Sequence, residues 1–178
     1  QLAIRLSDQL GSIHQQNIIH KDINPANIIW NRDSNRVKLI DFGLATTLSR
    51  EDAEIRSPQI LEGTLAYISP EQTGRMNRTL DYRTDYYSMG ATFYQLLVGQ
   101  PPFVGKDPIE LGHAHIARQS TPPHELNTAV PRPLSDIIMR LLAKNAEDRY
   151  QSAFGLKADL ENCLSQWQTN GLIMPFPL

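Results

Sequence analysis

Three polar side chains near the start of the chain could act together on a phosphate group. Asp22 and Asn27 belong to the run from His20 to Asn27, and Asp41 follows fourteen residues later. A carboxylate can orient a hydroxyl group, and amide and carboxylate oxygens are ligands that Mg²⁺ prefers. An isolated Asp and Asn at this spacing are typical of a turn or a helix cap. The downstream segment that contains Asp41, at this spacing, favours a phosphate-transfer site instead.

The two segments resemble the catalytic loop and the metal-binding segment of protein kinases, H-x-D-x-x-x-x-N followed by D-F-G. The resemblance implies that Asp22 is the catalytic carboxylate. It implies that Asn27 and Asp41 hold Mg²⁺ against the phosphates of ATP, and that Ile29 lies beneath the adenine. The implied reaction moves the γ-phosphate of ATP to a hydroxyl group of a protein substrate.

Further motifs resemble parts of the kinase C-terminal lobe. The run 63–71 resembles the end of an activation segment, and Thr64 in it matches a Thr that lies beside the catalytic Asp. The resemblance also implies structural roles: His20 packs against Phe42, Asp85 accepts hydrogen bonds from the catalytic-loop backbone, and Arg149 pairs with Glu71 in a geometry that Lys cannot reproduce. The implied structural residues are His20, Phe42, Gly43, Glu71, Asp85 and Arg149.

Asn24 departs from the family pattern, because Ser/Thr kinases usually carry a Lys at this position. An Asn keeps hydrogen bonding but loses the positive charge that steadies the transferring phosphate, and one lost donor can cost about 3 kcal/mol of transition-state stabilisation. Kinases of small hydroxylated molecules also lack that Lys. The candidate catalytic residues are therefore Asp22, Asn24 and Thr64.

Lys21 is a second departure, since many regulated kinases have an Arg there that grips an activation-loop phosphate with two parallel hydrogen bonds. A Lys can attract a phosphate but cannot form that bidentate contact. Four hydroxyl-bearing residues after Asp41 are candidate phosphorylation sites, but the favoured interpretation is that they are ordinary loop residues. The candidates are Thr46, Thr47, Ser49 and Ser57.

No glycine-rich phosphate loop and no strand Lys with a helix Glu partner precede the catalytic segment in these 178 residues. The nucleotide would therefore be bound from one side only, by a surface that we call the floor of the site, with no lobe covering its other side. Leu2, Leu6, Leu10 and Ile13 recur at helical spacing with no capping residue before them, so we expect the chain to begin inside a helix. We expect a C-terminal lobe without its N-terminal β-lobe, with little or no activity alone.

The elements that must position these residues are mostly helical. The apolar pattern predicts a helix to about residue 15, a hairpin around the turn 31–35, and an irregular stretch from 41 to about 81. Further helices are predicted from residue 82, at roughly 108–118, near 134–142 and near 156–167, with proline-stiffened connectors at 121–123 and 130–133. One buried stripe is expected to comprise Tyr86, Met89, Phe93, Leu96 and Leu97.

The predicted fold class is mainly α with a small β-hairpin, as in the C-terminal lobe of the kinase-like (α+β) fold. The domain is expected to cover 1–167, with a catalytic loop at 18–27, an activation segment at 41–71 and a helical subdomain at 82–167. Residues 168–178 are expected to form a linker to a following domain.

Composition narrows the class of protein. The net charge of -2 gives no electrostatic reason to expect a nucleic-acid partner, and no stretch approaches the roughly 20 apolar residues of a membrane span. The single cysteine, Cys163, lies among Leu160, Leu164 and Trp167, which recur at helical spacing, and is interpreted as a core residue. These features and the absence of a signal-peptide pattern at the start predict a cytoplasmic protein.

The run from Tyr67 to Arg78, followed by Leu80 to Asp85, resembles the kinase module of large bacterial signalling proteins, frequent in cyanobacteria. In those proteins the module precedes an AAA-type ATPase domain, a GAF domain and a sensor histidine kinase, which the resemblance implies as partners in the same polypeptide. Three hypotheses stay open: a Ser/Thr-type protein kinase, a pseudokinase-like regulatory or docking module, and a small-molecule kinase.

Overall fold

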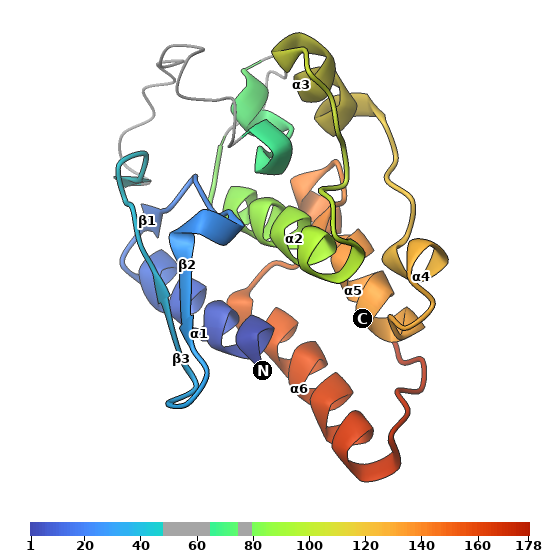
Figure 1. The fold of residues 1–178 in the computed structure, drawn as a ribbon. Coiled ribbons are helices and arrows are strands. Elements are labelled where there is room, and N and C mark those ends of the chain that lie inside the picture. The colour runs from blue at the N-terminus through green and yellow to red at the C-terminus, as the bar shows by residue number, and fades with distance from the viewer. Residues whose placement is uncertain (48–64, 75–79) are drawn as a thin grey trace.

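The computed structural model of the chain describes residues 1–47, 65–74 and 80–178 (Figure 1). Its helices are α1 (Leu2–Gln15), α2 (Arg83–Val98), α3 (Pro108–Ala117), α4 (Pro123–Leu126), α5 (Arg132–Leu141) and α6 (Ala153–Asn170). Its strands are β1 (Ile18–Ile19), β2 (Ile28–Asn31), β3 (Arg36–Leu39) and β4 (Thr46–Thr47). Short 3₁₀ turns are η1 (Pro25–Asn27), η3 (Leu65–Tyr67), η4 (Glu71–Thr73) and η5 (Ala146–Asp148). The predicted fold class, mainly helical with little sheet, is confirmed.

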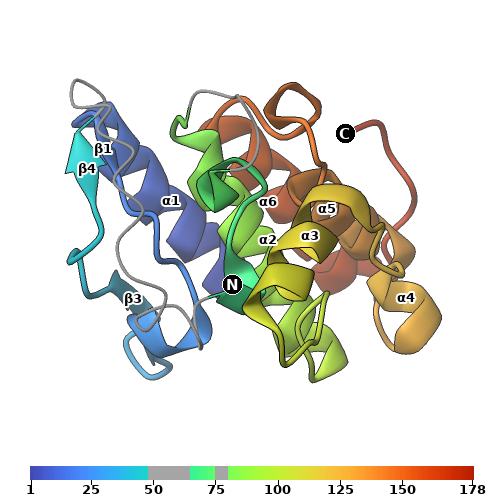
Figure 2. The same cartoon turned by 90° about the horizontal axis from the view of Figure 1, so that it is seen from above.

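Helix α2 forms the centre of the molecule, with α1 and α6 on one side and α3 and α4 on the other (Figures 1 and 2). All its residues from Thr84 to Tyr94 are buried, so the helix has no solvent-facing stripe over three turns. Gly90 permits the close approach of α5, because a Cβ atom there would lie 2.7 Å from the Cβ of Leu141. The prediction of Leu96 in the buried stripe is wrong, since its side chain is 53% exposed beyond the buried turns.

The hairpin of β2 and β3 follows the predicted turn, with Ile28 opposite Leu39 and Trp30 opposite Val37. The side chain of Gln9 in α1 fixes this hairpin to the helix, because it accepts a hydrogen bond from the N–H of Leu39 at 3.0 Å and donates one to the carbonyl of Val37. The hairpin therefore leads from the catalytic loop out along α1 and back to Asp41.

A second antiparallel pair, β1 with β4, corrects the prediction of one small sheet. Ile18 lies opposite Thr47 and Ile19 opposite Thr46. Strands of two residues leave no period-two pattern in the sequence, so alternation could not reveal them. The pair places the segment after Gly43 beside the entry to the catalytic loop.

Two helical details also differ from the predicted boundaries. Helix α4 begins at Pro123 inside a predicted connector, where a proline is tolerated because the first turn lacks N–H partners anyway. Helix α6 continues to Asn170 and ends at Gly171, whose φ of 65° is left-handed. Beyond it, Ile173 and Phe176 pack against the main core, so part of the segment 168–178 lies on the helical body.

Cys163 is buried in the main core, as predicted, and burial raises the pKa of its thiol to about 11. A thiol of that pKa is protonated at neutral pH and behaves as a small apolar group. Among the described residues, no helix combines the length and the apolar character needed to cross a membrane.

Candidate active site

The backbone of the catalytic loop is fixed from below by Asp85, in the first turn of α2. Its fully buried carboxylate accepts hydrogen bonds from the N–H of His20 at 2.9 Å and from the N–H of Lys21 at 2.8 Å. Lys21 has a left-handed φ of 66°, which is disfavoured for a residue with a Cβ atom. The two bonds to Asp85 therefore stabilise a backbone shape that the sequence alone would avoid.

His14, in the last turn of α1, is a further partner of Asp85. Its Nε2 lies 2.8 Å from Oδ2, the carboxylate oxygen that also accepts from the N–H of His20, and its ring packs against Tyr82 and Tyr86. A buried carboxylate is stable only when hydrogen bonds replace its lost water, so these three bonds form one unit. Sequence reasoning missed His14; the available signal was its place on the buried face of α1, four residues after Leu10.

Asp22 is half-buried, and two amides hold its carboxylate. The Nδ2 of Asn24 donates to one carboxylate oxygen at 2.9 Å, and the Nδ2 of Asn27 donates to the other at 2.8 Å. Both amides also donate to the backbone carbonyl of Asp22. The two side-chain amides consequently fix the orientation of the carboxylate.

The side chain of Asn24 is directed inward rather than toward a substrate phosphate. Besides its bonds to Asp22, its Oδ1 accepts from the N–H of Ala26 at 2.9 Å and so caps the 3₁₀ turn η1. The side chain is buried, with 7% of its residue surface exposed. Asn24 therefore orients Asp22 where the family pattern would place a mobile ammonium group.

Asp41, Phe42 and Gly43 lie next to the catalytic loop. The N–H of Ile40 donates to the carbonyl of Asn27 at 3.0 Å, which brings Asn27 and Asp41 to the same end of the β2–β3 hairpin. Asp41 has a left-handed φ of 62°, and its Oδ1 accepts from the N–H of Gly43 at 3.1 Å. Its exposed carboxylate keeps oxygen lone pairs for a cation.

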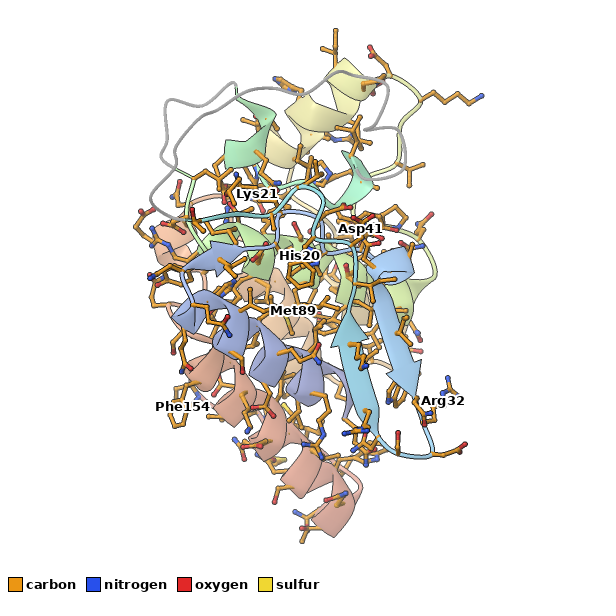
Figure 3. All side chains as sticks on the ribbon, turned by 90° about the vertical axis from the view of Figure 1, so that its left-hand side faces the viewer. His20, Lys21, Arg32, Asp41, Met89 and Phe154 are labelled. Carbon is orange, nitrogen blue, oxygen red and sulfur yellow. The ribbon has the colours of Figure 1, made fainter. Side chains whose placement is uncertain are left out.

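His20 connects the two segments through its ring. The ring is fully buried, its centroid lies 4.7 Å from that of Phe42, and its Nε2 lies 3.2 Å from the carbonyl oxygen of Ile40. Figure 3 shows His20 with Lys21 and Asp41 in one layer of the molecule, above Met89 of α2. The packing and the hydrogen bonds give His20 a structural place rather than that of a metal ligand.

The residues fit magnesium held together with a nucleotide better than a fully protein-bound ion. Among the described residues, no three His, Cys, Asp or Glu side chains gather as a metal site. Mg²⁺ is commonly held by one or two protein oxygens together with phosphates and water. Asn27 and Asp41 supply such a pair of oxygen-bearing side chains.

An apolar surface borders Asp41. Ile29 is 52% exposed, Phe42 is 46% exposed, and Ile40, on the other side of Asp41 in the sequence from Phe42, is 37% exposed. Apolar side chains of this size are stabilised when they are covered, by about 25 cal/mol per Å². The surface is thus able to take a flat apolar group such as a purine.

The end of the activation segment is anchored by a buried ion pair. The guanidinium of Arg149 is fully buried and donates to both oxygens of Glu71, at 2.6 and 2.9 Å. Burial by itself raises the pKa of Glu71, but the hydrogen bonds and charge of Arg149 outweigh it and hold the pKa below its ordinary value. Thr84, in α2, also donates to Glu71 at 2.8 Å, so the segment end is tied to the central helix.

Some predicted residues are not part of this geometry. Thr64, Ser49 and Ser57 lie outside the described residues, whereas Thr46 and Thr47 form β4. Leu65 in η3 is the start of the described segment that packs on α3, where it forms a small apolar cluster with Ile68, Phe103, Leu111 and Ala114. This cluster is separate from the main core and joins the described segment 65–74 to α3.

The known proteins that resemble this chain in sequence are protein kinases. A family model described as the protein kinase domain matches residues 2–160. Serine/threonine-protein kinase PknB of Mycolicibacterium smegmatis is 38% identical over 151 residues, which are 85% of this chain and 24% of that protein. PknB of Mycobacterium tuberculosis is 37% identical over the same coverage, and a probable serine/threonine-protein kinase of Corynebacterium efficiens is 35% identical over 90% of this chain and 24% of its own. The chain spans about a quarter of the length of these relatives.

Proposed function

The chain belongs to the protein kinase domain family, and from this membership we propose that it forms the catalytic floor of a Ser/Thr-type protein kinase. The proposed reaction transfers the γ-phosphate of ATP to a hydroxyl group of a protein substrate. The observation that carries the proposal is the carboxylate of Asp22, which two amides orient beside Asp41. The similar proteins named serine/threonine-protein kinases support the proposed class of acceptor.

In this proposal the protein contributes orientation more than covalent chemistry. Asp22 accepts a hydrogen bond from the acceptor hydroxyl and aligns it with the phosphate, which is sufficient for a loose transition state. Because the amide nitrogen of Asn27 faces Asp22, its carbonyl oxygen is the atom left for magnesium, together with the carboxylate of Asp41. Bound magnesium would neutralise charge on the β- and γ-phosphates.

Asn24 gives the site a different balance from the common family pattern. Its amide fixes Asp22, and no ammonium group occupies that position to follow the charge of the transferring phosphate. We therefore propose slower phosphate transfer than a Lys at this position would give, at an unchanged orientation of the acceptor hydroxyl.

The exposed apolar surface around Ile29 and Phe42 supports a second part of the proposal. Adenine covers the floor at Ile29, and a lobe that these 178 residues do not contain covers the nucleotide from above. Without such cover, water enters the site and the 178-residue chain alone has little or no activity.

We further propose a setting for the chain. The run from Tyr67 to Arg78 favours a kinase module of a multidomain bacterial signalling protein, with an AAA-type ATPase, a GAF domain and a sensor histidine kinase in the same polypeptide. We place this protein in the cytoplasm, where Mg-ATP is available.

The competing function is a regulatory or docking module. Asn24 favours it because it lacks the positive charge usual at this position, and Lys21 favours it because it cannot form the bidentate phosphate contact of the usual Arg. The deciding experiment uses the longest native protein that contains this chain, incubated with Mg-ATP and a mixture of Ser- and Thr-containing peptides. We expect labelled phosphoserine or phosphothreonine that is lost in Asp22→Ala. If neither the wild type nor Asp22→Ala labels the peptides, the docking module is favoured. If label appears only on a small hydroxylated molecule, a small-molecule kinase is favoured.

The same assay on the purified 178-residue chain tests the requirement for a covering lobe. We expect no transfer above background. Transfer by this chain that Asp22→Ala abolishes would show that the floor is sufficient, and it would refute that part of the proposal.

A further inference from the structure

Gln72 links the end of the activation segment to the catalytic loop through both polar atoms of its side chain. Its Oε1 accepts a hydrogen bond from the N–H of Ser69 at 3.1 Å, and its Nε2 donates to the carbonyl of Lys21 at 2.9 Å. An amide oxygen cannot donate and an amide nitrogen cannot accept, so both bonds agree on one orientation of the side chain. The link joins residues 51 positions apart in the sequence.

The local fold explains why Gln72 can reach the loop. The 3₁₀ turn η4 runs over Glu71–Thr73 and ends at Gly74, whose φ of 68° favours glycine. The hydroxyl of Thr73 donates to the carbonyl of Pro70 at 2.6 Å, and the N–H of Gln72 donates to the Ser69 hydroxyl at 3.4 Å. The run Ser69-Pro70-Glu71-Gln72-Thr73-Gly74 therefore forms a rigid single turn in which Glu71 faces Arg149 and Gln72 faces the loop.

Lys21 is held at both ends of its backbone by this arrangement. Asp85 accepts from its N–H at 2.8 Å, and Gln72 donates to its carbonyl. Its left-handed φ of 66° lacks intrinsic support in a residue with a Cβ atom, so the two bonds select this conformation. The next residue is Asp22, and the peptide that Gln72 binds is the one joining Lys21 to Asp22.

We propose that Gln72 is the positioning residue that couples the end of the activation segment to Asp22, through the main chain of Lys21 and not through its side chain. The proposal rests on the proposed function, in which Asp22 is the catalytic carboxylate. A bidentate Arg contact would make the loop depend on an activation-segment phosphate, and Lys21 cannot make that contact. With Gln72, the loop responds instead to the position of residues 69–72, which the Glu71–Arg149 pair fixes without a phosphate.

The test measures amide hydrogen exchange of Lys21 in the purified 178-residue chain by NMR, as a protection factor corrected for intrinsic exchange. Gln72→Met has a similar length and removes both hydrogen bonds. We expect the protection of the Lys21 amide to fall about fivefold, the equivalent of one net hydrogen bond. Protection of Met89 in α2 and the free energy of unfolding measured at Met89 should stay as in the wild type.

Gln72→Glu gives a signature that a purely structural role would not. A Glu can still accept from the Ser69 N–H, but at neutral pH its second oxygen repels the Lys21 carbonyl. When the carboxyl group is protonated its O–H can donate to that carbonyl, so the protection of Lys21 should return toward the wild-type value as the pH falls through about 4 to 5. The wild type, measured at each pH, should show no such recovery.

Gln166→Met is the matched control, because Gln166 in α6 also accepts from a backbone N–H, that of Met174, far from the loop in sequence. It should leave Lys21 protection unchanged. Unchanged protection in Gln72→Met, an equal loss at Lys21 and Met89, or no recovery of Gln72→Glu in acid would each refute the coupling. Amide exchange needs neither nucleotide nor substrate, so failure of the proposed kinase function would be seen separately, as absent phosphate transfer with the Lys21 result intact.

Discussion

The catalytic loop is held in different ways on the side of α2 and on the side of Asp41. Toward α2, the buried carboxylate of Asp85 receives three hydrogen bonds, from His14, His20 and Lys21. Toward Asp41, Ile29 and Phe42 each leave about half of their surface open to solvent. The loop is thus fixed through its backbone from below, whereas the groups that would meet a nucleotide stay accessible.

This difference has an energetic meaning. A buried charge that loses one partner is left without solvation, whereas an exposed group that loses a contact regains water. Substitutions below the loop should therefore act on stability, and substitutions on the open side should act on binding with little effect on stability. Four substitutions test this contrast.

The largest effect is expected at Arg149. Arg149→Met leaves Glu71 buried without its guanidinium, and the free energy of unfolding should fall by about 3–5 kcal/mol in a denaturant titration. Arg32→Met is the matched control, because Arg32 is an exposed cation lying 5.0 Å over the ring of Trp30. Arg32→Met should lower the free energy of unfolding by less than about 1 kcal/mol. Equal losses in the two variants would contradict the contrast.

A smaller loss is expected for Asp85→Asn. The amide has one acceptor oxygen in place of two, so the N–H of His20 or of Lys21 loses its acceptor, and unfolding should become easier by about 2–3 kcal/mol. Asp81→Asn provides the comparison, since Asp81 pairs with Arg83 in a partly exposed position. If Asp81→Asn cost as much as Asp85→Asn, burial would not be the deciding property.

The pH dependence of stability should report the Glu71 pair. The pKa of Glu71 is lower in the folded chain than its ordinary value of 4.5, so below that value protons bind preferentially to the unfolded chain. The stabilisation that the ionised Glu71 carboxylate gives to the fold is complete above pH 4.5, and it is lost as the pH falls through the pKa that Glu71 has in the folded chain. Thermal unfolding between pH 3 and 6 should therefore show a steeper loss for the wild type than for Glu71→Gln. Parallel curves would show that Glu71 does not titrate between the two states.

The smallest effect on stability is expected at Ile29. Ile29→Ala should change the free energy of unfolding by no more than about 0.5 kcal/mol, because the side chain is half exposed. Ile23→Ala, at a fully buried isoleucine of the same loop region, should cost about 2–4 kcal/mol. Mg-ATP affinity should fall in Ile29→Ala if adenine covers this side chain, and calorimetry on the full-length protein measures it. An unchanged affinity would place the adenine elsewhere.

Much of the fold could be predicted from local signals. The turn 31–35 has five polar residues between two apolar runs, and the hairpin around it agrees with the prediction within a residue or two. The first helix ends at Gln15, before Asn17 with its φ of 57°. In these places the residues themselves restrict the backbone, so sequence is sufficient.

Other features depend on partners that are distant in the sequence. The β1–β4 pair joins two residues with two others, and such short pairing carries no periodic signal. The spacing of Leu96 fits the helical stripe, but at this position the helix has left the core and the side chain is exposed. Asn24 could be recognised as a departure from a pattern, but its inward orientation follows from the place of Asp22 and Ala26 in space.

The burial of α2 from Thr84 to Tyr94 has a consequence for how fast the chain folds. Its sequence contains Gly90 and several aromatic and β-branched residues, so the isolated segment has little helical tendency and needs its neighbours. Those neighbours are far along the chain: the bond from His14 to Asp85 spans 71 positions, and the bond from Arg149 to the carbonyl of Arg83 spans 66. Long loops must close before these contacts form, and we expect folding on the slow side for a helical protein, with α2 becoming structured late and together with the helices that enclose it.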